Sequence, residues 1–223
     1  MMLLLKEIID WAEVWTVLIP LFILLKHNKQ PRNFKPVIIY LWVALFLNTA
    51  ADVIWKRAKL HLFLSVDNNN PIYNTHSIIR LLLFSWFFNT LDQSFLKPLK
   101  QILPFVFLLF VFINFMYYDN YFDRKISFRL YSLEAGILLI YCLQYYFSLL
   151  LSKHETFVTD LSSFWIVTGL SIFVIVGLPV YVFYNTLLIN HVEFAKKIWL
   201  APKISFAVFC ILISQAFAIQ KNE

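Results

Sequence analysis

Two ionisable side chains, His76 and Arg80, lie in an apolar segment, residues 72–91, that is long enough to cross a membrane. A charge at the middle of a bilayer costs at least about 2.5 to 3.5 kcal/mol, so Arg80 should face other helices and have an acidic partner. Asp52 and Glu134, in neighbouring apolar segments, are the candidate partners. A histidine beside a carboxylate can also transfer protons. This set therefore permits ion pairing, ligand binding or acid–base catalysis.

The composition is typical of a membrane protein. Of the 223 residues, 61% are hydrophobic, 14% are charged and only three are glycine, whereas roughly a quarter of the residues in soluble domains are charged. Apolar runs of about 20 residues recur along the chain, which matches a bilayer core of roughly 30 Å. Only helices satisfy the backbone of such runs, since the alternating pattern of barrel strands is absent. We therefore expect one all-α, polytopic domain, residues 1–223, with no soluble module at either end.

Seven transmembrane helices are predicted. The expected spans are residues 8–25, 36–55, 72–91, 102–118, 128–151, 161–188 and 199–215. Pro179 predicts a kink in the sixth span. The first span should remain as an anchor, because charged residues precede it and no small-residue cleavage site follows it. The formal charge of +6 is carried mainly by short loops, which favours contact with anionic lipid headgroups rather than with nucleic acid.

Polar side chains gather at one end of this predicted bundle. Because successive spans alternate in direction, the starts of the odd-numbered spans and the ends of the even-numbered spans share one membrane side. The polar residues placed there are Asp10, Glu13, Asn48, Asp52, Asn74, His76, Arg80, Arg129, Glu134, Asn185 and Lys203. The other half of the bundle is expected to be almost purely Leu, Ile, Val and Phe.

Helical spacing places several of these residues on inward faces. At 100° per residue, Tyr73, His76 and Arg80 lie on one face of the third span. Glu134 lies on one face of the fifth span, together with tyrosines of that span. Arg80 and Glu134 lie roughly 12 and 9 Å deep, at 1.5 Å rise per residue. We expect a polar cup with aromatic walls, a small-ligand site. The candidate ligand-binding residues are Asp52, Asn74, His76, Arg80, Tyr131, Glu134, Tyr141 and Asn185. The alternative is a buried ion pair that only sets helix register.

Several kinds of chemistry lack their motifs. The sequence contains neither a Gly-rich phosphate loop nor a G-x-S-x-G elbow. The five histidines lack metal-ligand spacing, so no metal and no cofactor is expected. Cys142 and Cys210 both fall inside predicted spans, so no disulfide framework is implied. Acid–base catalysis by His76 with Asp52 or Glu134 stays open.

Three short segments resemble a family of small bacterial seven-helix membrane proteins, whose relatives include the membrane input regions of some sensor histidine kinases. The segments are Tyr73-Asn74 with the aliphatic run after it, Ser132-Leu133-Glu134, and Phe164-Trp165-Ile166 with Gly169. Members of that family tend to carry an acidic residue where this chain has Arg80. The resemblance implies a sensor-like protein of the bacterial inner (cytoplasmic) membrane, and it brings no established activity.

The distribution of Lys and Arg gives only a weak indication of how the chain is oriented in the membrane. Ten Lys and Arg residues lie on the N-terminal side and eight on the other side, although residues 26–35 form a dense basic loop. The kinase-fused relatives require a cytoplasmic C-terminus, so we expect the N-terminus outside and the C-terminus in the cytoplasm.

Three functions are compatible with this pattern. The first is a non-enzymatic receptor-like or accessory protein that binds a small or lipid-like ligand in the cup and signals to a partner protein. The second is a transporter or channel component, and the third is a membrane-embedded lipid-modifying enzyme. Membrane lipids are expected partners in each case, and nucleic acid in none.

Overall fold

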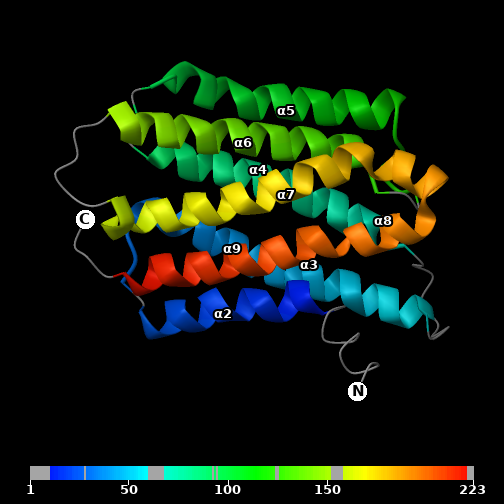
Figure 1. Cartoon of the computed structure of the whole chain (residues 1–223), viewed down its shortest axis with the longest axis horizontal. Helices are drawn as coiled ribbons and strands as arrows, with labels where there is room; N and C mark the ends of the chain where they lie inside the picture. Colours follow the sequence, from blue (N-terminus) through cyan, green and yellow to red (C-terminus); the bar gives the residue numbers. More distant parts are fainter. Residues whose placement is uncertain are drawn as a thin grey trace.

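The computed structural model describes residues 11–27, 29–59, 68–91, 93, 95–123, 126–151 and 158–219, and it is all-α within them. Figure 1 shows the helices lying side by side along the long axis of the molecule. They are α2 (Ala12–Lys26), α3 (Lys35–Lys59), α4 (Asn70–Thr90), α5 (Lys97–Tyr117), α6 (Phe128–Leu151), α7 (Ser162–Asn190), the short α8 (Val192–Ile198) and α9 (Leu200–Ala218).

Five helical stretches of the described chain are long and apolar enough to cross a membrane. They are Arg32–Lys56, Lys97–Tyr117, Phe128–Leu151, Ser162–Asn190 and Val192–Ala218. Of the seven predicted spans, the other two correspond to α2 and α4. α2 has only 15 described residues, and polar residues such as Asn74, His76 and Arg80 lower the mean hydropathy of α4. Large apolar side chains also cover the outside of the bundle, as on α5, where Phe105 is 73% exposed. The chain is a helical bundle compatible with a membrane protein.

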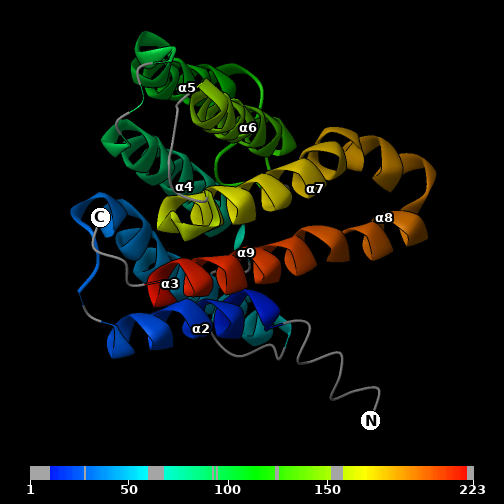
Figure 2. The ribbon, with the colours of Figure 1, turned by 60° about the vertical axis from the view of Figure 1, so that its left-hand side comes forward.

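Six of the long helices form a closed ring. α2 packs against α3, α3 against α4, α4 against α6, α6 against α7, α7 against α9, and α9 against α2. α5 contacts only α4 and α6 to a significant extent, and it lies at the outer edge of the bundle in both ribbon views (Figures 1 and 2). The interior enclosed by the ring is therefore lined by helices that are far apart in the sequence.

The two main differences from the prediction are the start of α5 and an additional short helix, whereas the other helix bounds agree with the predicted spans to within about four residues. α5 begins at Lys97 rather than residue 102, because Pro98 fits the first turn of a helix. Residues 192–198 form α8, which was expected to be part of a loop.

The end of the bundle expected to be almost purely apolar also holds a buried charge. Lys100 is 2% exposed. Its Nζ donates hydrogen bonds to the carbonyls of Phe88 and Leu91 and to Oε1 of Gln93, at 3.0, 3.3 and 3.1 Å. The prediction was wrong here because an early start to α5 places this lysine inside the bundle, against the C-terminal carbonyls of α4.

Candidate functional site

The acidic partner of Arg80 is Glu134, across the interface of α4 and α6. The guanidinium donates two hydrogen bonds, from Nε to Oε1 and from Nη2 to Oε2, the second at 2.7 Å. Ser77 Oγ donates to the same Oε2 at 2.5 Å. Arg80 is 6% exposed and Glu134 is 1% exposed. This fork-to-fork geometry is the strong form of an Arg–carboxylate pair, and it fixes the direction of the Arg80 side chain.

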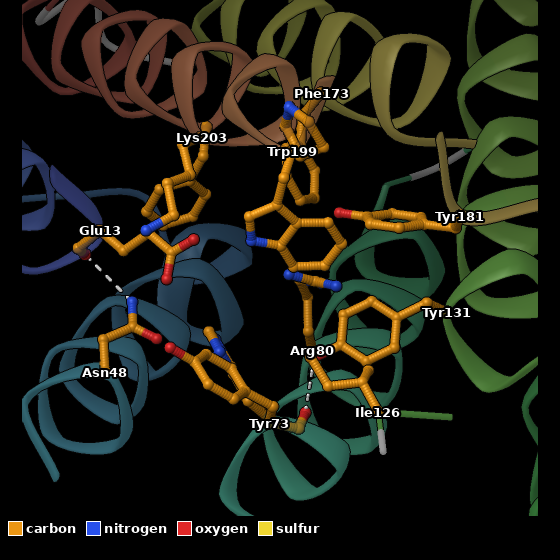
Figure 3. Close-up of a pocket in the computed structure, with 13 residues that line it drawn as sticks. Glu13, Asn48, Tyr73, Arg80, Ile126, Tyr131, Phe173, Tyr181, Trp199 and Lys203 are labelled. Carbon is orange, nitrogen blue, oxygen red and sulfur yellow. Dashed lines mark hydrogen bonds between the residues drawn. The ribbon is translucent and has the colours of Figure 1, made fainter. Parts of the chain in front are cut away.

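A cavity of about 50 Å³ lies inside the ring, with Arg80 in its wall. All six ring helices contribute lining residues, and α5 contributes none (Figure 3). The polar and charged lining residues, apart from tyrosines, are Glu13, Asn48, His76, Arg80 and Lys203. The aromatic ones are Tyr73, Tyr131, Phe173, Tyr181, Trp199 and Phe206. A mostly apolar wall with a few polar groups is the usual make-up of a small-molecule site.

A second cavity of about 340 Å³ adjoins the first, nearer the end of the bundle where the predicted polar residues gather. The two cavities share five lining residues: Glu13, Tyr73, Ile126, Trp199 and Lys203. Asp52 lies in this outer cavity rather than beside Arg80. We call the two together the polar cavity, with an inner part of about 50 Å³ and an outer part of about 340 Å³.

His76 is a lining residue of the inner part. The residue is 5% exposed, and its ring stacks on Tyr40 with centroids 5.8 Å apart. Its Nε2 atom has no hydrogen-bond partner among the residues that the structure describes. Burying such an atom without a partner costs about 1 to 3 kcal/mol. A ligand in the inner part could supply that partner. Glu134 receives bonds from Arg80 and Ser77 instead, so the two groups do not form an acid–base pair.

Glu13 and Lys203 are the charged residues that line both parts of the polar cavity. Figure 3 shows their side chains entering it from α2 and α9. Both are half-buried, and neither side chain forms an ion pair or hydrogen bond with another residue in the described part of the chain. Asn48 Nδ2 donates to the backbone carbonyl of Glu13 at 3.0 Å, which ties the start of α2 to α3. The sequence predicted both residues at the polar end of the bundle. That they line the same cavity depends on the contact of α2 with α9.

Three of the predicted site residues lie elsewhere. Asn74 is fully buried, and its Nδ2 donates to the carbonyl of Tyr121 at 3.4 Å, so it holds the connection between α5 and α6. Tyr141 Oη donates to the carbonyl of Lys100 at 3.0 Å, in the opposite half of the bundle. Asn185 is exposed near the end of α7 and lines a separate cavity of about 170 Å³. Of the remaining five, all but Glu134 line the polar cavity.

Aromatic rings fill the interior beyond the inner part. Phe84 lies one helical turn past Arg80 on α4 and is fully buried. Its ring centroid is 5.0 Å from that of Tyr40 and 5.7 Å from that of Phe209. Phe209 in turn lies 6.0 Å from Phe173 and 6.2 Å from Phe206. We call these five rings the aromatic floor of the polar cavity.

No group of three or more His, Cys, Asp and Glu side chains is placed to bind a metal ion within the described ranges. No protein-family model, curated protein or solved structure matches the chain.

Proposed function

We propose that this chain is a seven-helix integral membrane protein that binds a small ligand in the polar cavity and acts as a receptor-like or accessory module. The observation that carries the proposal is the cavity itself, because all six ring helices contribute side chains to it. A ligand that touches six helices at once can change how they pack, and a change in packing is what a partner protein in the membrane can recognise.

The aromatic floor favours binding over conduction. A transporter or channel needs polar groups along a continuous path, whereas Tyr40, Phe84 and Phe209 pack ring against ring directly beyond the inner part. Catalysis by His76 would require a carboxylate in contact with it, and Glu134 is occupied by Arg80 and Ser77. Receptor-like binding is therefore the function that these contacts support best.

The location forms part of the proposal. Five apolar helical stretches suit a membrane, and the resemblance of Tyr73-Asn74 and Ser132-Leu133-Glu134 to bacterial seven-helix proteins favours the inner membrane. In this arrangement α2 and α4, which complete the ring, also cross the bilayer. With the N-terminus outside and the C-terminus in the cytoplasm, the polar cavity opens away from the cytoplasm and samples extracellular or periplasmic molecules.

The test is a ligand screen with a variant that fills the cavity. The protein would be purified into nanodiscs, and thermal unfolding measured against a panel of neutral, cationic, anionic and zwitterionic small molecules. Ile126 lines both parts of the cavity, so Ile126→Trp should occupy the space. Ile140→Trp is the matched control, since Ile140 lies on α6 with 41% exposure away from the cavity.

We expect at least one panel compound to raise the melting temperature of the wild type and of Ile140→Trp but not that of Ile126→Trp, because only bound ligand stabilises the folded state. A panel that stabilises nothing, or that stabilises all three proteins equally, would refute ligand binding in this cavity.

A further inference from the structure

We infer that the ligand of the polar cavity is a small zwitterion, with a cationic ammonium group held by Glu13 and an anionic carboxylate or phosphate group held by Lys203. The inference rests on the proposed function and specifies the chemical class that the cavity takes. The inference begins from a difference between two sets of charged residues. The inner charges Arg80 and Glu134 satisfy each other, whereas the carboxylate of Glu13 and the ammonium of Lys203 have no ionic partner in the described part of the chain.

The position of these two residues determines what could neutralise them. Both line the inner and the outer part, and Figure 3 shows their side chains at the inner part. They enter from different helices and do not reach each other as an ion pair. A molecule that carries both charges on neighbouring atoms can bind both at once. A ligand with one charge would leave the other residue half-buried and unpaired, which is unfavourable.

The surrounding rings favour an ammonium group as the cationic end. Trp199 and Tyr73 line both parts of the cavity, as Glu13 does. An ammonium ion that lies over an aromatic face gains attraction from the ring quadrupole, in addition to its contact with the carboxylate.

The size of the two parts limits the rest of the ligand. The inner part, about 50 Å³, is enough for a few groups the size of water, which need roughly 10 to 15 Å³ each. His76 is one of its lining residues, and the Nε2 atom of this histidine has no hydrogen-bond partner among the described residues. The ligand should therefore extend a short polar group inward to His76, while the outer part, about 340 Å³, admits the zwitterionic end. Free amino acids have this chemistry, and so does the ethanolamine headgroup of a phospholipid.

The experiment separates these two sources. Binding of the common free amino acids would be measured by calorimetry with protein in phosphatidylglycerol nanodiscs. The tightest ligand would then be compared with its amide, which lacks the carboxylate, and with its N-acetyl derivative, which lacks the ammonium. Replacing phosphatidylglycerol by phosphatidylethanolamine in the nanodisc tests the lipid headgroup, which should stabilise the protein and compete with the free amino acid.

Two substitutions, with a matched pair of control substitutions, test which residue binds which charged group of the ligand. Glu13→Gln should weaken binding of the zwitterion about tenfold or more and leave binding of the N-acetyl derivative unchanged. Lys203→Met should weaken the zwitterion similarly and leave the amide unchanged. The control is the exposed ion pair of Glu193 and Lys196 on α8, where Glu193→Gln and Lys196→Met should change nothing. The double exchange of Glu13→Lys with Lys203→Glu keeps both charges, and it should restore zwitterion binding lost in either single exchange.

The outcomes are distinct. Amide and N-acetyl derivatives that bind as tightly as the parent, or variants of Glu13 and Lys203 that weaken all three compounds equally, would overturn the zwitterion inference. A cavity that binds only neutral or singly charged compounds would overturn it too, and the proposed receptor-like function would stand. If neither the panel nor either lipid stabilises the protein, both proposals fail.

Discussion

Arg80 on α4 and Glu134 on α6 form a bidentate ion pair that is almost completely buried, with Ser77 as an additional donor to the carboxylate. The guanidinium carbon also lies 4.9 Å from the ring centre of Phe173 on α7. One side chain thus connects three of the six ring helices beneath the mouth of the polar cavity. The pair has a structural role whether or not a ligand contacts Arg80.

Replacing one partner of this ion pair should destabilise the fold much more than replacing both partners with apolar residues. We expect Arg80→Met or Glu134→Leu alone to destabilise the fold by about 3 to 5 kcal/mol, because each leaves one buried charge uncompensated. The double variant should recover most of that loss, since two apolar side chains replace two paired charges. Reversible unfolding in detergent micelles would measure all three. A double variant as unstable as the sum of the single variants would show that the pair contributes through contacts other than its charges.

Gly169 on α7 should be intolerant of even one added methyl group. A Cβ there would lie 2.9 Å from Cδ2 of Phe209 and 3.1 Å from Cβ of Leu212, so α7 and α9 would have to separate. We expect Gly169→Ala to destabilise the protein by about 1 to 3 kcal/mol.

Gly136 provides the matched comparison, because a Cβ at that position meets nothing within 4 Å. Gly136→Ala should stabilise the protein by about 0.5 to 1 kcal/mol, as expected for alanine in a helix. Thermal melting of the two variants side by side tests the packing, and the prediction is contradicted if both shift in the same direction.

Lys100 should matter for stability although it lies far from the polar cavity. Lys100→Met removes the donor to the carbonyls of Phe88 and Leu91 at the end of α4 and leaves them buried. We expect a loss of about 1 to 3 kcal/mol and faster hydrogen exchange in the last turn of α4. Lys97 is exposed one turn earlier, and Lys97→Met should have little effect. Equal effects of the two substitutions would mean that the buried hydrogen bonds are not what Lys100 contributes.

The polar cavity should be accessible from one side only. We expect a small, charged thiol reagent to label His76→Cys and not Phe84→Cys, because the aromatic floor lies between the cavity and the opposite end. The two native cysteines, Cys142 and Cys210, are buried and would be replaced by alanine to remove background. Labelling of Phe84→Cys from either membrane side would indicate a continuous path and would favour the transporter hypothesis.

A C-terminal reporter fusion should place the C-terminus in the cytoplasm. A cytoplasmic fluorescent or enzymatic reporter should be active there, and a reporter that requires export should be inactive. The opposite result would turn the cavity toward the cytoplasm, and its ligand would then have to be a cytosolic molecule or an inner-leaflet lipid.

Local sequence signals determined the helices of this protein. Hydropathy and turn residues depend only on neighbouring positions, so α6 was predicted with the bounds observed, Phe128–Leu151. The need of Arg80 for an acid, and the inward stripes of α4 and α6, also follow from burial and from the 3.6-residue period alone. The start of α5 was the main local error, where Lys97 and Lys100 resembled a loop.

Tertiary packing decided which polar residues meet. From the predicted positions of the residues in the membrane, either Asp52 or Glu134 could pair with Arg80. The contact of α4 with α6 brings Glu134 to Arg80. Glu13 and Lys203 share a cavity only because α2 closes the ring against α9. Helical periodicity shows which face of a helix is buried, but not which helix it is buried against. That choice depends on the order and rotation of the helices in the bundle, which are set by contacts between distant parts of the chain.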